Sequence, residues 1–257
     1  MKKTIIHIII PAVLVMGIAG QAIGFAPIGP ASSDLGQGQF AAGFDYANGE
    51  IGASADYHHR TVTGLGWKVV FQGENSLGDI EMDGYYARLA FGLNDRCQVF
   101  ARLGQAESGP DKAFAWGFGS KVTLIESDRL DWGLMSQVHF SSFEESLTNP
   151  DWAYAEGQID LSAVQVAAGP VYKGDGFRVY GGPFLSWVKG DGEIKGGLIT
   201  PDETILPATV PFDLTKDLEI GAYVGVSWDF TESVGLNSEY QYAADWTLWG
   251  LGLSFKF

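Results

Sequence analysis

The chain has 257 residues and a formal charge of −15; 35 residues are Gly and 13% are aromatic. This acidic balance argues against nucleic acid as a partner, because phosphate binding needs a basic patch. Cys97 is the only cysteine, so a disulfide framework is excluded. We expect no metal and no other cofactor, since the sequence offers no set of ligands at metal-binding spacing.

The first residues have the pattern of a secretory signal peptide. Lys2 and Lys3 give a basic start, an apolar run follows over residues 4 to 18, and small residues surround Ala22 and Ala26. The run is shorter than the ~20 apolar residues that a membrane-spanning helix needs. We expect a Sec-type signal peptide over residues 1–22, with cleavage at residue 22 or as late as residue 26.

Residues 23–36 contain Pro and Gly and are predicted to form an exposed N-terminal tail in the periplasm. Residues 37–257 form one domain, in which side chains alternate with a period of two between turns. The sixth strand breaks this alternation near Ser162 and Ala163, which predicts a bulge. The predicted strands cover residues 37–47, 82–93, 97–106, 114–125, 130–143, 158–172, 177–189, 218–230, 234–243 and 246–257.

The connections between these strands alternate in length. Long connections at residues 48–81, 144–157 and 190–217 and a medium one at 107–113 are separated by short turns. Outer-membrane barrels sort their connections in this way, with short periplasmic turns and long extracellular loops. We therefore predict an all-β fold, a closed antiparallel transmembrane β-barrel of about ten strands within a range of 8–12, with both termini in the periplasm. A soluble lipocalin-like barrel is the alternative.

The last strand alternates strictly and ends on an aromatic residue. One face carries Trp249, Leu251, Leu253, Phe255 and Phe257, and the other carries Gly, Ser and Lys256. The segment resembles the C-terminal membrane-insertion signal of bacterial outer-membrane β-barrel proteins. That resemblance implies that the barrel-assembly machinery reads the final Phe during insertion.

Together with the Gly-rich strands and the turn at residues 92–96, this ending makes the chain similar to outer-membrane barrels of the porin and opacity-protein type. The resemblance is architectural and covers residues 37–257. It implies a place in the outer membrane of a Gram-negative bacterium, among outer-membrane lipids and lipopolysaccharide. No motif for a particular function comes with it, and fold alone does not settle function.

Alternation assigns the side chains to two faces. Aromatic residues near the strand ends are expected to form girdles at the two membrane interfaces. The girdle residues are Trp116, Trp132, Trp187, Trp228, Tyr240, Tyr242 and Trp246. The residues expected to line the lumen are Asp45, Arg88, Arg102, Lys121, Gln137, His139, Arg178, Glu219, Asn237, Glu239, Gln241 and Lys256.

The charges expected in the lumen allow two interpretations. Opposite charges can pair across the interior and plug it, or they can line a narrow wet path for small solutes. On this basis we predict a narrow porin-like channel or a structural surface protein. The acidic outer loops, above all residues 191–214, suggest an adhesin or a receptor for an extracellular ligand as an alternative.

Two short patterns raise the question of catalysis. His139-Phe140-Ser141 resembles the His-x-Ser pair of lipid A deacylase barrels, with Glu144, Glu145 and Glu156 as candidates for the orienting group. Alternation points this pair into the lumen, whereas a lipid hydrolase needs it open to the bilayer. Asp56-Tyr57-His58 has the Asp-x-His form of the ten-stranded omptin proteases but lies too early in the chain, and His58-His59 alone is weak evidence for a metal. We expect no enzyme.

Overall fold

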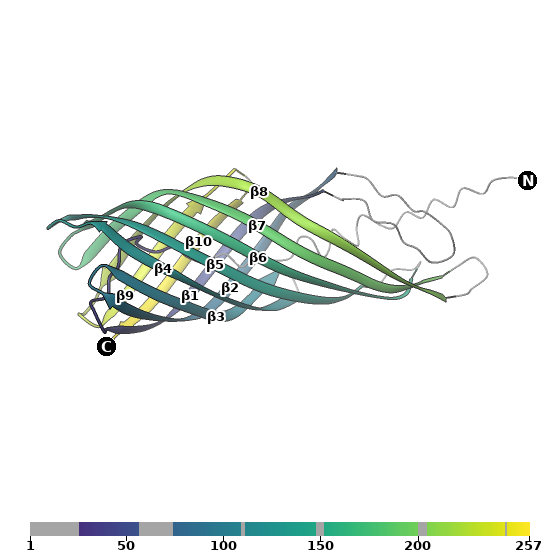
Figure 1. The fold of residues 1–257 in the computed structure, drawn as a ribbon, viewed down its shortest axis with the longest axis horizontal. Helices are drawn as coiled ribbons and strands as arrows, with labels where there is room; N and C mark the ends of the chain where they lie inside the picture. Colours follow the sequence, from purple (N-terminus) through teal and green to yellow (C-terminus); the bar gives the residue numbers. More distant parts are fainter. Residues whose placement is uncertain (1–25, 57–73, 109–110, 148–151, 200–204, 245) are drawn as a thin grey trace, which may run out of the picture.

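The computed structural model describes residues 26–56, 74–108, 111–147, 152–199, 205–244 and 246–257. Within these residues, ten antiparallel strands form a closed barrel in which the first strand pairs with the last (Figure 1). The strands are β1 (Phe40–Asp56), β2 (Glu74–Asn94), β3 (Cys97–Ser108), β4 (Asp111–Ile125), β5 (Leu130–Leu147), β6 (Trp152–Lys173), β7 (Phe177–Ile199), β8 (Ile205–Asp229), β9 (Val234–Tyr242) and β10 (Trp246–Lys256).

The predicted fold class is confirmed, because each expected strand is present and the sheet closes on itself. We call the end where β10 terminates the C-terminal mouth and the opposite end the hairpin end. Short turns lie at the C-terminal mouth, whereas the strands run far out at the hairpin end (Figure 1). No helix among the described residues has the length and apolar character needed to cross a membrane, a finding that does not concern β-strands.

The predicted loop over residues 190–217 is wrong. Residues 190–199 of β7 pair with residues 205–214 of β8, so this segment is mostly a β-hairpin. Its prolines suggested a loop, since Pro cannot donate to a sheet. β8 pairs with β9 only from Ala222 to Asp229, so Pro207 and Pro211 lie where the other edge of β8 is unpaired. A missing N–H costs little at such an edge.

The predicted bulge at Ser162 and Ala163 is also wrong, because β6 pairs with β5 without interruption from Ala155 to Tyr172. Leu161, Ala163 and Gln165 all point inward. The apparent break in alternation arose because this stretch of the inward face carries apolar as well as polar side chains. The long connections predicted at 48–81 and 144–157 are likewise shortened by strand residues on both sides.

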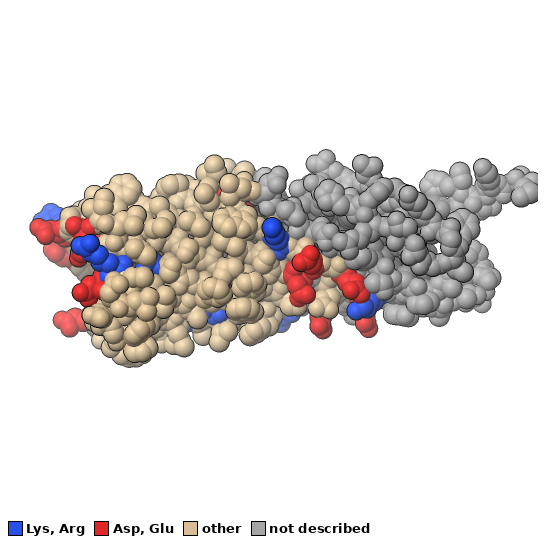
Figure 2. All heavy atoms as spheres, in the orientation of Figure 1, with Lys and Arg blue, Asp and Glu red and all other residues tan. Residues whose placement is uncertain are grey.

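The outward face carries a broad belt of exposed apolar side chains. Leu89, Ile220 and Val224 are each more than half exposed, as are many outward residues on the other strands. On the face drawn in Figure 2, the same belt is a band with few Lys, Arg, Asp or Glu atoms, between charged residues on both sides. Soluble proteins seldom expose so large an apolar surface. A lipid bilayer is the environment that shields such a surface from water.

The aromatic and insertion-signal residues lie on this outward face, with one exception. Those exposed there include Trp116, Trp132, Trp228, Tyr240, Tyr242, Trp249, Leu253, Phe255 and Phe257, while Trp187 and Leu251 are half-buried. The girdle assignment of Trp246 is wrong, because its side chain is buried and its Nε1 donates to Glu219 at 2.7 Å. Trp246 is an even-numbered residue of β10, as is Lys256, so its side chain belongs to the inward face.

A charge placed in the middle of the belt should destabilise the barrel. Leu103 is 56% exposed on the outward face of β3. We expect Leu103→Arg to lower the free energy of unfolding by about 2–4 kcal/mol in phospholipid vesicles, because the guanidinium would be held in hydrocarbon. Urea titration of the refolded protein measures the change. Asp175→Arg, in the exposed turn between β6 and β7, is the control, and equal effects of the two changes would contradict the belt assignment.

Candidate functional site

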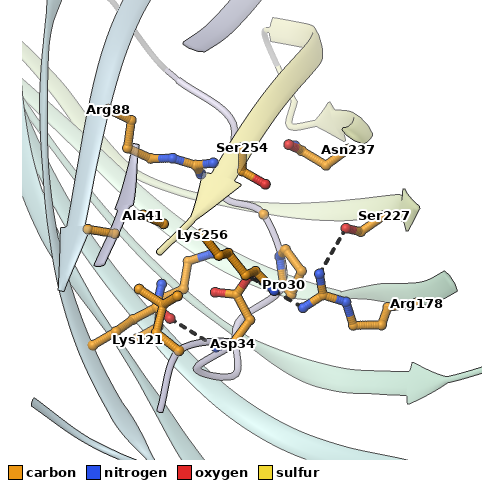
Figure 3. Close-up of a pocket in the computed structure, with 14 residues that line it drawn as sticks. Pro30, Asp34, Ala41, Arg88, Lys121, Arg178, Ser227, Asn237, Ser254 and Lys256 are labelled. Carbon is orange, nitrogen blue, oxygen red and sulfur yellow. Dashed lines mark hydrogen bonds and ion pairs between the residues drawn. The ribbon is translucent and has the colours of Figure 1, made fainter. Parts of the chain in front are cut away.

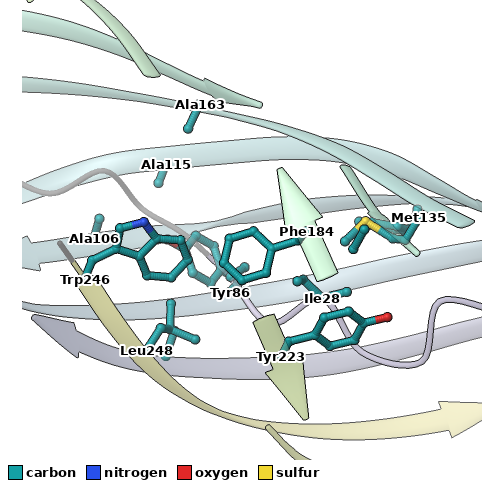
Figure 4. Packing of buried hydrophobic residues seen from close by; sticks show 14 of the residues in the cluster. Ile28, Tyr86, Ala106, Ala115, Met135, Ala163, Phe184, Tyr223, Trp246 and Leu248 are labelled. Carbon is teal, nitrogen blue, oxygen red and sulfur yellow. The ribbon is translucent and has the colours of Figure 1, made fainter. Parts of the chain in front are cut away.

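A stretch of chain that precedes β1 fills the lumen. We call residues 26–36 the lumenal segment. Ala26, Ile28 and Ala31 are fully buried, and Leu35 is nearly so. The predicted exposed tail is therefore wrong for these residues. Figure 4 shows Ile28 packed among inward side chains of the wall, including Tyr86, Phe184 and Tyr223.

The wall satisfies the backbone polar groups of the lumenal segment. The Glu239 carboxylate accepts hydrogen bonds from the backbone N–H groups of Ile28 and Gly29, each at 2.7 Å. Arg102 donates to the carbonyl of Pro27 at 2.7 Å, and Gln137 and Gln241 reach the carbonyl of Ala26. An irregular segment can be buried only when its N–H and C=O groups find such partners.

Glycines make room for the segment. A Cβ atom added at Gly92 would overlap the carbonyl of Gly36, one at Gly133 would overlap the backbone of residues 31 and 32, and one at Gly250 would overlap the Pro27 ring. Three separate strands thus lack a side chain where the segment passes. The inner surface of the barrel is shaped to hold a polypeptide.

A polar layer crosses the lumen beside the segment. Asp45 on β1 accepts a hydrogen bond from Arg102 Nε at 2.8 Å, and Arg102 also donates to Gln137. The relay continues from Gln137 to Gln165 at 2.6 Å, from Gln165 to Gln241 at 2.9 Å and from Gln241 to Glu239 at 2.7 Å. Of the two sequence interpretations, pairing across the interior describes this layer.

The twelve residues expected in the lumen all have inward-facing side chains. Those that are buried are Asp45, Arg102, Lys121, Gln137, His139, Asn237, Glu239 and Gln241. Arg88, Arg178, Glu219 and Lys256 are partly exposed. Sequence reasoning missed Gln165, which the supposed bulge obscured, and Asp34, which was assigned to the exposed tail.

The C-terminal mouth holds a second polar cluster. Asp34 of the lumenal segment lies 3.5 Å from Arg178 Nη1 and 3.5 Å from Lys256 Nζ (Figure 3). Arg178 also contacts Asp229 at 3.3 Å. Burial by itself would raise the pKa of Asp34, but the positive charges of Arg178 and Lys256 outweigh that effect and hold the pKa below its usual range. Asp34 therefore stays ionised at neutral pH.

The lumen toward the hairpin end is lined differently. Beyond the polar layer, inward residues such as Ala106, Phe143, Trp246 and Leu248 are buried and apolar. Figure 4 shows Trp246 and Leu248 directed into this part of the barrel. The lumen is thus charged at the C-terminal mouth, rich in amides and ion pairs at mid-height and apolar beyond it.

The candidate hydrolase pair lies in this interior. His139 and Ser141 are buried on the inward face of β5, and neither ring nitrogen of His139 has a hydrogen-bond partner among the described residues. A nucleophile needs contact with its base, which this arrangement does not provide. Glu144 and Glu156 are exposed instead of approaching His139. The described part of the chain contains no cluster of metal-ligating side chains, while His58 and His59 lie outside it.

Among the comparisons with known proteins, the alignment with the OmpT structure supports the fold. No family model and no curated protein matches this chain. Among solved structures, the outer-membrane protease OmpT from Escherichia coli aligns with a TM-score of 0.50 at 11% identity, over 85% of this chain and 97% of that one. The translocator domain of the autotransporter NalP from Neisseria meningitidis aligns with a TM-score of 0.45 at 14% identity, over 88% and 90%. The fold is that of outer-membrane β-barrels.

Breaking the central ion pair should cost stability. The side chains of Arg102 and Asp45 are fully buried. We expect Arg102→Met to lower the free energy of unfolding by about 3–5 kcal/mol, because Asp45 would keep a buried charge with only Arg88 nearby. The double variant with Asp45→Asn should recover part of this loss. Urea titration in vesicles measures both.

The control for this experiment is Arg96→Met, because Arg96 pairs with Glu126 at 3.5 Å in an exposed turn. Exposed pairs contribute about 1 kcal/mol or less. A loss at Arg102 no larger than the loss at Arg96 would contradict a tightly packed polar layer.

Proposed function

We propose that the protein is an outer-membrane channel for small solutes that is closed by its own lumenal segment. The observation that supports this proposal is the way the lumen is filled. A polypeptide, and not wall side chains alone, occupies the space inside the polar layer and the C-terminal mouth. Removing it would leave, at the C-terminal mouth and beside the polar layer, a space about as wide as a polypeptide chain.

The connection between the lumenal segment and β1 suits a moving part. Gly36 to Gln39 form a tight turn in which Gln39 N–H donates to the Gly36 carbonyl at 3.2 Å. Gly38 has a φ of 78°, a conformation that glycine adopts without strain. The segment belongs to none of the strands, so it can leave through the C-terminal mouth without breaking a strand pair.

The contacts that hold the segment are mainly polar. Ile28 and Leu35 are its large buried apolar side chains, while most other contacts are hydrogen bonds and ion pairs to the wall. Water can replace such contacts, so the cost of withdrawal is far below that of unfolding a strand. In this proposal the C-terminal mouth faces the periplasm, and the hairpin end faces outward.

Deleting the lumenal segment should open the channel. We expect the full-length protein to show rare or no unitary current steps in planar bilayers, and a variant lacking residues 27–35 to show stable steps. Glu239→Gln should raise the open fraction, because it weakens the hold on Ile28 and Gly29. Glu193→Gln, on the extended part of β7, should leave conductance unchanged.

The deletion variant must first be shown to be folded, by its strand circular dichroism and its heat-modifiable migration in gels. If the folded variant gives no steps at any salt concentration, the wall itself closes the lumen and the channel proposal fails.

A second candidate function is recognition at the cell surface. The β7–β8 hairpin stays paired up to Ile199 and Ile205, well beyond the apolar belt, and carries exposed or half-exposed charges including Asp191, Glu193 and Lys195. A paired hairpin presents its side chains in a fixed arrangement, as an adhesin or receptor requires. This feature supports the candidate without identifying a ligand.

Shortening this hairpin separates the two functions. We expect a variant lacking residues 191–214 to remain a folded barrel with the conductance of the full-length protein. If recognition is the function, whole cells bearing this variant should lose a phage or ligand that the full-length protein captures. Retained capture would exclude the hairpin as the recognition surface.

A further inference from the structure

A small cavity lies at the C-terminal mouth, between the lumenal segment and the barrel wall. Its volume is about 30 Å³, room for about two water molecules. Four basic side chains line it, from Arg88, Lys121, Arg178 and Lys256, and among its lining residues Asp34 is the one acid. These groups come from β2, β4, β7 and β10, and Figure 3 shows Arg178 and Lys256 close to Asp34, with Arg88 farther away beside Ser254.

The basic groups are not fully neutralised. Asp34 is shared between Arg178 and Lys256 at 3.5 Å each, distances too long for good hydrogen bonds. Arg88 lies 3.7 Å from Asp45, which already binds Arg102 at 2.8 Å. Arg178 also contacts Asp229 at 3.3 Å. Asp34, Asp45 and Asp229 are the carboxylates that contact this group of basic residues, whose members are Arg88, Arg102, Lys121, Arg178 and Lys256, so positive charge is in excess around the cavity.

Lys121 gives an independent indication of a ligand. Its side chain is 3% exposed and lines the cavity, and no hydrogen bond or ion pair within 4 Å joins its ammonium to a described residue. Asp34 and Glu239 attract it only from a longer distance. Burying an ammonium without a partner is costly, and buried cations are normally paired. The Nζ atom lies against Gly29, where a Cβ atom would come within 2.8 Å of it.

We propose that this cavity is a binding site for a phosphate dianion that enters from the C-terminal mouth. Arg178 offers N–H groups arranged for phosphate oxygens, one of which, Nε, has no partner among the described residues. Lys121 and Lys256 act as point charges. The cavity is too small for phosphate beside the Asp34 carboxylate, so the dianion takes its place and Asp34 is an internal stand-in for the ligand.

This exchange would loosen the lumenal segment, because Asp34 ties it to β7 and β10. That consequence rests on the proposed channel function, whereas phosphate binding itself does not. Phosphate in the periplasm would then favour the open state.

The test is isothermal titration calorimetry of the full-length refolded protein in detergent, with inorganic phosphate added at constant ionic strength in chloride buffer. We expect Asp34→Asn to bind phosphate about ten-fold more tightly than the natural protein, because the competing carboxylate is gone, and Lys121→Met to bind it about ten-fold more weakly. Lys112→Met is the control, since Lys112 pairs with Glu107 on the exposed face. Lys256→Met is the second variant if Lys121→Met does not fold.

Four outcomes bear on the proposal. Absence of phosphate binding by both the natural protein and Asp34→Asn overturns it, as does an Asp34→Asn variant that binds no more tightly than the natural protein. A short-chain phosphatidic acid, titrated in parallel, distinguishes the source: binding of this lipid without binding of inorganic phosphate would mean a lipid headgroup and overturn the solute site. If the variant lacking residues 27–35 conducts while Asp34→Asn ignores phosphate, the channel stands and the phosphate site fails.

Discussion

The Glu239 carboxylate binds two consecutive backbone N–H groups of a segment that belongs to no strand, and much of the interior depends on this contact. A closed barrel of this size encloses a space that its own side chains must fill or leave to water. Here a peptide fills it, and each buried N–H or C=O group of that peptide needs a partner. Glu239, Arg102, Gln137 and Gln241 provide those partners from four positions around the wall.

The outer surface of the barrel has the opposite requirement, because it must present apolar side chains to lipid. Where the described strands have a neighbour on both sides, their backbone groups bond to those neighbours, so a bilayer there meets apolar side chains and no unsatisfied peptide group. The alternation that places Phe255 and Phe257 outward places Lys256 inward, where it meets Asp34. The same alternation therefore places apolar side chains on the lipid-facing surface and charged side chains in the interior. Inward side chains are basic at the C-terminal mouth and mostly apolar toward the hairpin end.

Much of this architecture could be predicted from sequence, because a period of two is a local property. The strand number, the closed antiparallel fold and the inward direction of residues such as Arg102 and Glu239 follow from it. Two sequence signals conflict at Trp246: its even position in β10 predicts the inward face, whereas its aromatic character predicts a membrane interface, and the buried side chain follows the first. The length of the β7–β8 hairpin depended on an unpaired neighbouring edge, which sequence does not display.

The lumenal segment could not be predicted for a different reason. Small residues, Pro and Gly are typical of an exposed linker, and they also suit a peptide that must fit a crowded interior. The difference between the two is the set of hydrogen-bond partners, which come from residues 64 to over 200 positions away in the chain. The wall glycines at positions 133 and 250 leave room for the segment, but in the sequence alone they do not differ from other glycines in strands.

The burial of the lumenal segment is the central claim, and hydrogen exchange tests it directly. In the full-length protein in nanodiscs, peptides covering residues 27–36 should exchange much more slowly than a free peptide of the same sequence, because the Ile28 and Gly29 amides are bound to Glu239 inside the barrel. Exchange of this segment at the rate of a free peptide, with the strands still protected, would contradict the account.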